Sequence, residues 1–429
     1  MEAYPKRMPG MKIMIVTHAF PPMNATASHR VYSWAKTWSE NGHEVHVVTP
    51  EKHAFDGSMD LNYDMGEINL HIVPYLRRNK PRGASGDPFD KENIQRWERV
   101  KTYTRKLRFG MGMFMDLRML AFGPLVRKGR QLLQNGDFDF IISSYPPEVV
   151  HLAAYRLSRE FGMPWVADYR DLWFREMRLF QYRWTTFLSG IINRRLLRKA
   201  KMISTVSKGL SKRLEKVLNR GITVSYNGFI KPRWEIDSTR PWRDGKMHVV
   251  YTGRMYPGKR DPRMFLEAVS EFCQSEPRFD DRIAIDFYGY DVVYVESIAK
   301  ECGLEHCVTA HGFVPYDESL RVQQNAGALL FLDWAEESAE GVLTGKLFEY
   351  LSSGRPILCV GTRKDTEAAE IILKARCGVV VTSRAEIHSY LHELLEKEPQ
   401  ATPGIERVAS YSRESQARIL LEQISKSIR

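Results

Sequence analysis

Continuous apolar runs alternate along the first half of the chain with stretches whose apolar residues recur every three or four positions. The runs predict strands at 12–16, 44–48, 140–143, 165–168, 202–206 and 222–225, and the periodic stretches predict helices at 29–41 and 148–161. A strand that is apolar on both faces is typical of a parallel sheet covered by helices on either side. We therefore expect a doubly wound α/β domain in this half.

The same alternation of predicted strands and helices begins again in the second half of the chain. The intervening residues 231–246 are polar, contain two prolines and show no clear period, which indicates a linker. Further strands are predicted at 249–252, 283–288, 308–311, 328–332, 357–360 and 379–381, and helices at 264–272, 293–302 and 366–375. We expect two parallel-sheet domains, 1–230 and 247–407, that face a central cleft, with ligands beyond the carboxyl ends of the strands.

The number and spacing of the cysteines and the hydropathy of the chain indicate the cellular compartment. The five cysteines are odd in number and lack zinc spacing, which indicates reduced thiols in a cytosolic protein: Cys273, Cys302, Cys307, Cys359 and Cys377. No run is long and apolar enough to span a bilayer, and the apolar run at 11–16 is too short for a signal peptide. We expect a cytoplasmic protein.

Positive charge is concentrated in one segment. The formal net charge is +11, and residues 76–130 hold 15 Lys and Arg against 5 Asp and Glu. This excess favours an anionic partner, such as a lipid surface, a phosphorylated acceptor or nucleic acid, and a solvated face of a basic protein explains it equally well. The lipid interpretation places the protein peripherally on the inner face of the cell membrane.

Two cations follow the first strand of the second half, in the sequence YTGRMYPGKR. Arg254 leaves the strand after a glycine, and Lys259 follows a Pro-Gly turn. A guanidinium fork and an ammonium at the edge of a sheet suit a diphosphate, and ordinary surface cations are the alternative. The next two strands end in loops that contain Gly289 and Val314, whose backbone groups would line a flat nucleobase.

A short predicted helix between two core strands carries opposite charges one turn apart. In EGVLTGKLFEYLSSGRPIL, Thr344 is the expected N-cap and Gly354 the expected stop. Free N–H groups near Leu343, Thr344 and Lys346 would bind phosphate oxygens. Glu349 would accept two hydrogen bonds from a vicinal diol, such as a ribose. A simple Lys346–Glu349 ion pair would contribute only about 0.2–0.5 kcal/mol, a weak reason to place both charges beside a core.

The first half offers a second set of strand-end residues. The loop that begins at His18 runs through FPP into a helix and lacks the GxGxxG pattern of a dinucleotide site. Arg170 and Asp171 stand side by side after the strand at 165–168. Such a pair suits a sugar hydroxyl or a phosphate, and a salt bridge at the strand end is the alternative.

Together these loops resemble the GT-B glycosyltransferases of family GT4. The pieces are FPP, SYPP followed by ADYRDLW, TVSKGL with YNG, YTGRMYPGKR and GVLTGKLFEYLSSGRPIL, in the family's order and over nearly the whole chain. The resemblance implies a GT-B fold with two Rossmann-like domains. It also implies sugar transfer from a nucleotide-sugar with retention of anomeric configuration and without a metal or other cofactor. Residues 408–429 look like the terminal GT-B helix that packs back on the N-terminal domain.

The resemblance also assigns roles by position. Arg254 and Lys259 match the family's basic pair on the donor diphosphate, and Glu349 matches the second Glu of its E-x7-E motif, which holds the ribose. The first Glu of that motif falls on Gly341, and Glu340 lies one residue earlier.

The remaining assignments concern the catalytic residues. Arg170 and Asp171 stand at the family's strand-end His-Asp, with Arg170 in the place of the His. The resemblance thus implies catalytic roles for Arg170, Asp171 and Glu340.

These assignments lead to one expected function and two alternatives. We expect a hexosyl- or N-acetylhexosaminyltransferase that uses a UDP- or GDP-sugar and a glycan or lipid-linked acceptor in cell-surface polysaccharide biosynthesis. A sugar-nucleotide epimerase of the same fold and a non-catalytic nucleotide or nucleic-acid binder are the alternatives. The sequence contains no recognised nucleic-acid module or aromatic-basic repeat, so no nucleic-acid partner is expected.

Overall fold

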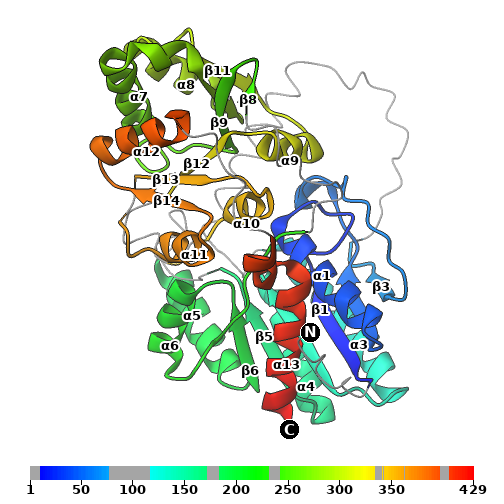
Figure 1. Cartoon of the computed structure of the whole chain (residues 1–429). Helices are drawn as coiled ribbons and strands as arrows, with labels where there is room; N and C mark the ends of the chain where they lie inside the picture. Colours follow the sequence, from blue (N-terminus) through cyan, green and yellow to red (C-terminus); the bar gives the residue numbers. More distant parts are fainter. Residues whose placement is uncertain are drawn as a thin grey trace, which may run out of the picture. The chain divides into compact units, whose positions relative to one another are not determined.

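The computed structural model describes residues 10–76, 116–171, 183–230, 242–333, 341, 343–361, 363–396 and 405–429 (Figure 1). The chain divides into two compact units. Unit 1 comprises Met1–Val206, Leu210–Ser225 and Ala417–Arg429, and unit 2 comprises Ser207–Gly209 and Tyr226–Gln416.

Unit 1 is built on a parallel sheet in the order β3-β2-β1-β4-β5-β6-β7. Its strands are β1 (Lys12–Thr17), β2 (Glu44–Pro50), β3 (Asn69–Val73), β4 (Phe140–Tyr145), β5 (Trp165–Tyr169), β6 (Met202–Thr205) and β7 (Thr223–Val224). Its helices are α1 (Thr26–Glu40), α3 (Phe122–Gln134), α4 (Glu148–Phe161), α5 (Arg183–Leu197), most of α6 (Lys208–Leu218) and most of α13 (Arg413–Ile428).

The apolar runs form strands here because both faces of the sheet are buried. In β1, Ile13 belongs to a core shared with α1 and α13, whereas Met14 belongs to the opposite core, shared with α3 and α4. Successive side chains of a strand point to opposite faces, so a strand covered on both sides must be apolar throughout. The indole N–H of Trp38 donates a hydrogen bond to the carbonyl oxygen of Ala417 at 2.9 Å, which ties α13 to α1.

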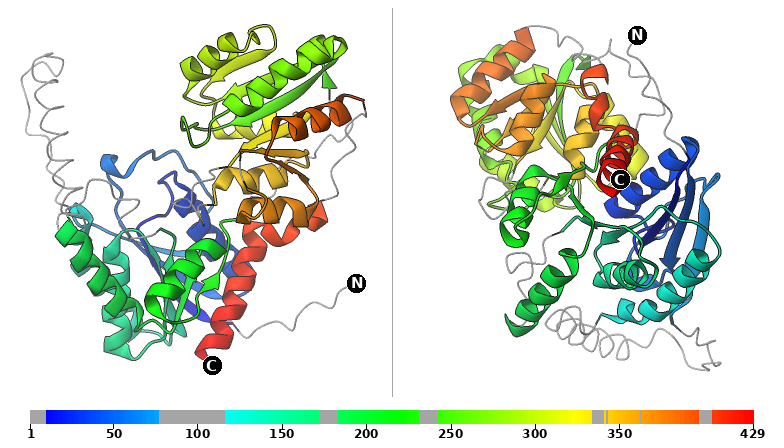
Figure 2. Two further views of the ribbon diagram at one scale, coloured as in Figure 1. Left: turned by 90° about the vertical axis from the view of Figure 1, so that its left-hand side faces the viewer. Right: turned by 90° about the horizontal axis from the view of Figure 1, so that it is seen from below.

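Unit 2 contains the parallel order β11-β10-β9-β12-β13-β14, with β8 antiparallel to β9. Figure 2 shows the strands and helices of this unit from two further sides. Its strands are β8 (Trp242–Arg243), β9 (Lys246–Thr252), β10 (Ile283–Tyr288), β11 (Val308–Gly312), β12 (Ala328–Leu332), β13 (Ile357–Val360) and β14 (Gly378–Val381). Its helices are α7 (Arg263–Ser275), α8 (Val292–Glu301), α9 (Tyr316–Gln324), α10 (Gly345–Ser352), α11 (Glu367–Ala375) and α12 (Arg384–Glu396). Each unit thus has the doubly wound order expected from the sequence, reversing beside its first long strand.

Within the predicted linker, residues 242–246 form a β-hairpin with the start of β9. Trp242 of β8 pairs with Met247 of β9, and the turn residues Asp244 and Gly245 have φ angles of 52° and 72°. Positive φ at both turn positions matches the twist of adjoining strands, and Asp-Gly is a favoured sequence for it. The rest of the predicted linker, residues 231–241, lies outside the described residues.

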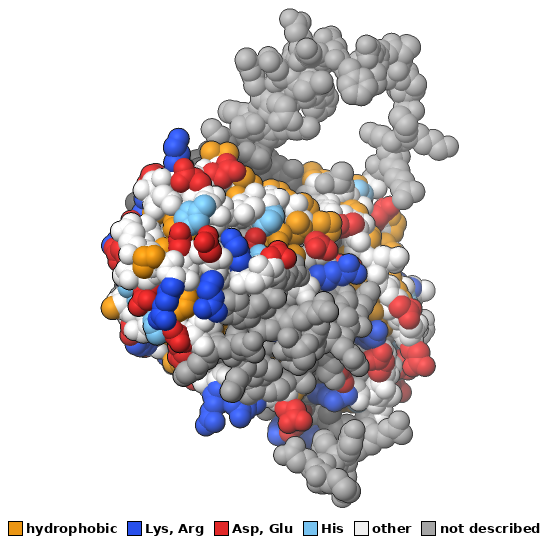
Figure 3. Space-filling view, turned by 45° about the horizontal axis from the view of Figure 1, so that its top comes forward, with side chains coloured by type: hydrophobic (Ala, Val, Ile, Leu, Met, Phe, Trp, Pro, Cys, Tyr) orange, Lys and Arg blue, Asp and Glu red, His pale blue; other side chains and the backbone are white. Residues whose placement is uncertain are grey.

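The basic segment is described only in part. Residues 77–115 lie outside the described residues, and 116–130 include η3 (Leu117–Ala121) and the first turns of α3. On the face shown in Figure 3, the described basic and acidic side chains are interspersed. Within the described ranges, no helix is long and apolar enough to cross a bilayer. The five cysteines are all free, as predicted.

Candidate functional site

A buried ammonium lies near the start of α10 in unit 2. The Nζ atom of Lys346 is 3.6 Å from the centre of the Tyr251 ring and has no hydrogen-bond partner among the described residues. Burial lowers the pKa of Lys346 well below its usual value, the charge of Arg260 lowers it further, and Glu349 opposes both only in part. An anionic ligand would supply the missing counter-charge.

Glu349 lies one turn after Lys346 on α10, and its carboxylate is surrounded by polar groups. Burial raises the pKa of Glu349, and this effect outweighs the charge of Arg413, a hydrogen bond from Gln323, the charge of Lys346 and a hydrogen bond from Tyr316. The carboxylate is therefore held among polar groups and is not consumed in the simple ion pair considered from the sequence. It remains available to a ligand with two hydroxyl groups.

The N-terminus of α10 has the predicted position without the predicted side-chain cap. Thr344 precedes the helix with extended backbone, and its side chain makes no capping hydrogen bond. Leu343 packs against the unit 2 core, and its N–H donates to the carbonyl oxygen of Gly341 at 3.1 Å. The first amide groups of α10 thus lack a side-chain cap, as a phosphate-binding role requires.

Glycine is needed at two positions where strand ends crowd together. Gly253 has a φ of 114°, and a Cβ atom there would lie 2.9 Å from Cε of Lys346. A Cβ atom on Gly289 would lie 2.3 Å from the carbonyl oxygen of Gly253. The predicted site residue Gly289 therefore permits close backbone packing. This packing places Lys346 beside the loops that follow β9 and β10.

One of the two predicted diphosphate ligands, Arg254, lies next to an exposed aromatic ring. Arg254 and Lys259 are both exposed on the loop after β9. The guanidinium carbon of Arg254 is 5.5 Å from the ring centre of Tyr290. Tyr290 stacks on Phe313 with ring centres 4.9 Å apart, and each residue is 63% exposed. Aromatic faces beside cations suit a planar base joined to a diphosphate.

Tyr290 and Phe313 were missed in the sequence analysis. Each directly follows a glycine at the end of a strand: Gly289 comes immediately after β10, and Gly312 is the last residue of β11. A large aromatic residue at such a position was the available signal in the sequence. The predicted residue Val314 follows Phe313 and is half-buried in the same loop. The loops after β10 and β11 thus present both backbone groups and aromatic faces at the carboxyl edge of the sheet.

Unit 1 contains a buried carboxylate that sequence reasoning also missed. Asp168 of β5 accepts hydrogen bonds from Nε and Nη2 of Arg30 at 3.3 and 2.9 Å. It also accepts from the hydroxyls of Ser144 and Ser204 at 2.7 and 2.8 Å. Both serines lie opposite Asp168 in the strand register, on β4 and β6. The hydrogen-bonded group of Asp168 and the two serines forms only when β4, β5 and β6 pair, so no local sequence pattern predicts it.

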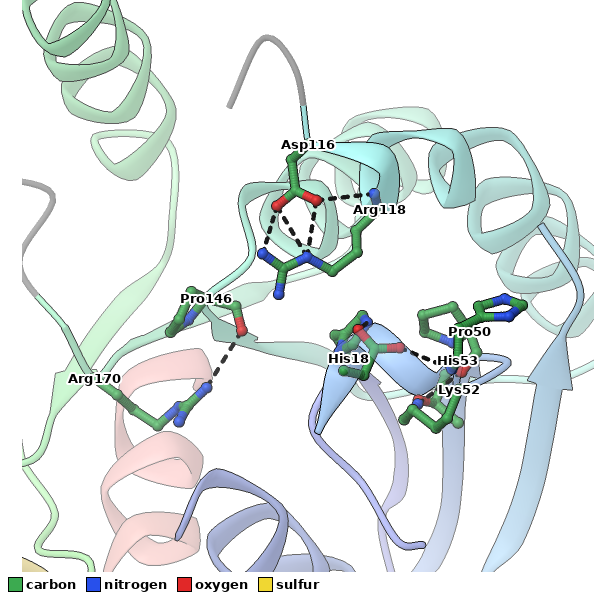
Figure 4. A network of polar contacts seen from close by, with 10 residues as sticks. His18, Pro50, Lys52, His53, Asp116, Arg118, Pro146 and Arg170 are labelled. Atoms are coloured by element: carbon green, nitrogen blue, oxygen red, sulfur yellow. Dashed lines mark hydrogen bonds and ion pairs between the residues drawn. The ribbon is translucent and has the colours of Figure 1, made fainter. Parts of the chain in front are cut away.

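The structure places the predicted pair Arg170 and Asp171 in different surroundings. Nε of Arg170 donates to the Ser144 hydroxyl at 2.9 Å. Nη2 of Arg170 donates to the carbonyl oxygen of Pro146 at 3.4 Å (Figure 4). Asp171 is exposed. Arg170 is therefore fixed at the strand end through the serine that also binds Asp168.

The remaining catalytic prediction, Glu340, lies outside the described residues. Its neighbour Gly341 has a φ of 90°, and its carbonyl oxygen accepts a hydrogen bond from the Ser207 hydroxyl. In the part of the chain that the structure describes, no three His, Cys, Asp or Glu side chains are grouped as ligands of a metal ion.

Comparisons with known proteins agree on one architecture. Residues 26–228 match the family described as "Glycosyl transferase 4-like domain". No curated protein sequence matches the chain. Among solved structures, HepE from Anabaena in complex with UDP has a TM-score of 0.59 at 13% identity, covering 97% of this chain and 100% of its own.

Two further solved structures have similar scores. The lipopolysaccharide outer core galactosyltransferase WaaB, in its apo form, has a TM-score of 0.58 at 14% identity, covering 97% of this chain and 99% of its own. Sucrose-phosphate synthase from Thermosynechococcus elongatus has a TM-score of 0.57 at 12% identity, covering 97% and 98%. At such identities the likeness establishes a shared fold.

Proposed function

Because this chain is a GT4-type glycosyltransferase with the GT-B fold, we propose that it transfers a hexosyl or N-acetylhexosaminyl group with retention of anomeric configuration. The donor is a UDP- or GDP-sugar, and the acceptor is a glycan or lipid-linked glycan. The observation that carries the proposal is the buried ammonium of Lys346 at the start of α10, which has no hydrogen-bond partner among the described residues. The UDP bound to HepE supports testing UDP first.

The proposed chemistry depends on charge that grows on the leaving group. As the glycosidic bond to the diphosphate breaks, negative charge accumulates on the diphosphate oxygens. Arg254 and Lys259 supply exposed positive charge, and Lys346 supplies a buried one. Such preorganised groups stabilise a transition state more strongly than water does, because they need no reorganisation during the reaction.

The same site distinguishes the nucleoside part of the donor. Glu349 accepts two hydrogen bonds from the ribose diol, in the proposed complex. The loops of Gly289 and Val314 supply backbone groups to the base, and the exposed Tyr290–Phe313 pair offers it an aromatic face. A base, a diol and a diphosphate are thus matched by three neighbouring groups of unit 2.

The sugar-facing roles rest on the family resemblance. We propose that Arg170 and Asp171 orient the transferred sugar and that Glu340 contacts its hydroxyl groups. We also propose a reaction that needs no metal ion, because Arg254, Lys259, Lys346 and the α10 amides supply the positive charge that the diphosphate requires. Full activity in excess EDTA would support this, and loss of activity that Mg²⁺ or Mn²⁺ restores would contradict it.

The proposed acceptor of the transferred sugar is a glycan of the cell surface. WaaB, which shares the fold, is a lipopolysaccharide outer core galactosyltransferase, and this supports a glycan acceptor. Residues 76–130 would bring the chain to an anionic bilayer. Exchange of several Lys and Arg residues of this segment for Ser should weaken binding to anionic liposomes. Unchanged liposome binding would exclude the membrane role.

The donor site can be tested by ligand-induced thermal stabilisation. We expect one of UDP, GDP, ADP and CMP to raise the melting temperature of the wild type selectively, because ligand that binds only the folded state stabilises it. Glu349→Gln should lose most of this shift, whereas Glu296→Gln, a change on an exposed position of α8, should retain it. Absence of a shift with every nucleotide would contradict a donor site in the free protein.

Two further assays separate the alternatives. Conversion of the nucleotide-sugar to its epimer without any acceptor would favour the epimerase. Tighter and strongly salt-dependent binding of RNA or DNA than of any nucleotide would favour the nucleic-acid binder. Transfer to an added glycan acceptor, with neither of these results, is the outcome that the proposal requires.

A further inference from the structure

A second polar cluster lies at the carboxyl edge of the unit 1 sheet, apart from the residues assigned to the donor. His18 follows β1, Lys52 follows β2 and Tyr75 follows β3, which are neighbouring strands. Arg118 lies on η3, and His53 follows Lys52 (Figure 4). Because the carboxyl ends of parallel strands meet at one edge, these side chains are gathered from distant parts of the sequence.

The hydrogen bonds of Lys52 within the described ranges go to two neutral acceptors. Its Nζ atom donates to the Thr49 hydroxyl at 2.7 Å and to the Pro50 carbonyl oxygen at 2.6 Å. Burial lowers the pKa of Lys52 to about 7, and the charge of Asp56 opposes this only in part. The ammonium therefore has two acceptors but no paired anion among the described residues.

Asp56 is already engaged by other groups. One of its carboxylate oxygens lies 3.1 Å from Nε2 of His18, and the other accepts a hydrogen bond from the backbone N–H of His53 at 3.0 Å. The side chains of His18 and Asp56 are each only 1% exposed. The carboxylate of Asp56 thus pairs with His18 and does not form an ion pair with Lys52.

Arg118 brings a second positive charge to the same place. Its Nε and Nη2 atoms bind the carboxylate of Asp116 at 2.6–2.9 Å, which leaves Nη1 without a partner among the described residues. In Figure 4 the guanidinium points toward the space between Pro146 and His18. Burial lowers the pKa of His18, the hydrogen bond with Asp56 opposes this, and the charges of Lys52 and Arg118 lower the pKa further. The two cations therefore lie within electrostatic range of one imidazole.

Two further buried polar atoms complete the cluster. The hydroxyl of Tyr75 and Nε2 of His53 have no hydrogen-bond partner among the described residues. Their rings are in contact, with centres 4.9 Å apart and planes at 79°. Leaving a buried polar group without a partner is energetically costly, so such groups usually mark a bound water or a ligand. Burial raises the pKa of Tyr75, the charge of Asp56 raises it further and the charge of Arg118 lowers it, so both charges act on this hydroxyl.

We propose that Lys52, Arg118, Tyr75 and His53 form a subsite for a phosphate group on the acceptor. Two charged donors and two further polar groups match a doubly charged anion with several acceptor oxygens better than they match a neutral sugar hydroxyl. The assignment to the acceptor rests on the proposed function, because the subsite shares no residue with the donor site. The phosphate belongs either to a soluble sugar phosphate or to a lipid-linked diphosphate.

The test is a calorimetric titration of inorganic phosphate into the protein saturated with UDP, which blocks the donor site. We expect saturable binding that weakens about tenfold or more in Lys52→Gln and in Arg118→Gln, because a charged hydrogen bond is lost. The matched controls Lys36→Gln and Arg130→Gln alter exposed cations of unit 1 and should bind phosphate as the wild type does. Equal phosphate binding in Lys52→Gln and the wild type would overturn the proposal.

A proton balance separates a direct role of Lys52 from a structural one. Phosphate beside Lys52 should raise its pKa, so binding at about pH 8 should take up a fraction of a proton. Titrations in two buffers of different ionisation enthalpy should show this uptake in the wild type and lose it in Lys52→Gln. Wild-type binding without proton uptake would contradict contact between Lys52 and the anion.

The outcome for this subsite is distinguishable from the outcome for the proposed function. If UDP binds but phosphate does not, the subsite is wrong and the donor site stands. If UDP does not bind, the same titration in Lys346→Met, which removes the buried cation of unit 2, still tests the subsite. Competition by a hexose phosphate would identify a soluble acceptor. Competition only by phosphatidylcholine vesicles that carry a polyprenyl diphosphate would identify a lipid-linked one.

Discussion

The Nζ atom of Lys346 lies 3.6 Å from the centre of the Tyr251 ring. Tyr251 is the second-last residue of β9, which ends at Thr252. A ring face stabilises an ammonium by about 0.5–2 kcal/mol, whereas taking the ion out of water costs several kcal/mol. The ring therefore offsets only part of the cost, and the rest is available to favour an anion that binds there. This relationship underlies the first prediction.

Lys346→Met should stabilise the free protein at neutral pH. The folded-state pKa of Lys346 lies below its usual value of 10.5, so the unfolded chain binds more protons between these two values. Stability of the wild type should accordingly rise with pH across this window. Removing the charge should raise the free energy of unfolding by on the order of 1 kcal/mol and flatten that rise. Urea denaturation at several pH values measures both effects.

The control for this prediction is Lys374→Met, which alters an exposed lysine of α11. It should leave the pH dependence unchanged. A Lys346→Met variant that is less stable than the wild type at neutral pH would show that the ammonium is satisfied in the free protein.

Glu349→Gln should separate stability from ligand affinity. Burial raises the folded-state pKa of Glu349 above its usual value of 4.5, so the folded protein binds the proton more tightly. The stability of the wild type should therefore fall as pH rises through this window. At pH 7 the Gln variant should be more stable but bind the nucleoside diphosphate about tenfold or more weakly. Thermal unfolding and calorimetry on one preparation measure the two effects, and a variant weakened in both respects would argue for a structural role.

Gly289→Ala should destabilise unit 2, because the new Cβ atom would lie 2.3 Å from the carbonyl oxygen of Gly253. Forcing such a contact typically costs about 1–3 kcal/mol. Gly221→Ala, where a Cβ would meet no atom within 4 Å, is the matched control. Equal unfolding midpoints for the two variants would show that the strand ends separate readily.

Asp168→Asn should destabilise unit 1 by about 3–5 kcal/mol, because it leaves the buried guanidinium of Arg30 without its carboxylate. Burial raises the pKa of Asp168, but Arg30, Arg170 and Ser144 together bring it below its usual value of 3.8. The stabilisation is therefore present above that value and is lost as pH falls below it. Acid unfolding curves should show this loss in the wild type.

The exposed residue Asp137 supplies the control for this carboxylate. Asp137→Asn should leave the acid unfolding curve unchanged. If Asp168→Asn unfolds in acid as the wild type does, Arg30 must be neutralised by another group.

The sequence predicted the parts of this molecule that depend on local pattern. The run 12–16 became β1 because alternate residues, such as Ile13 and Met14, fill opposite cores. The Asp244-Gly245 turn was equally local, but it was overlooked because the surrounding residues are polar and rich in proline.

The candidate site was predictable where one loop or helix carries it and not where strands must meet. Lys346 and Glu349 lie on one helix, so their spacing was visible in the sequence. Asp168 gained its role from Ser144 and Ser204, which reach it only through the register of β4, β5 and β6. The cluster of Lys52 and Arg118 likewise arises from the order of the strands, which no short motif encodes.

The central claim is that the buried ammonium at the start of α10 binds the diphosphate of a nucleotide-sugar. The most direct test is a calorimetric titration of UDP into the wild type, Lys346→Met and Lys374→Met. We predict saturable binding in the wild type and in Lys374→Met, and a loss of about tenfold or more in Lys346→Met, although that variant is the more stable protein. Equal UDP affinity in all three proteins would contradict the claim.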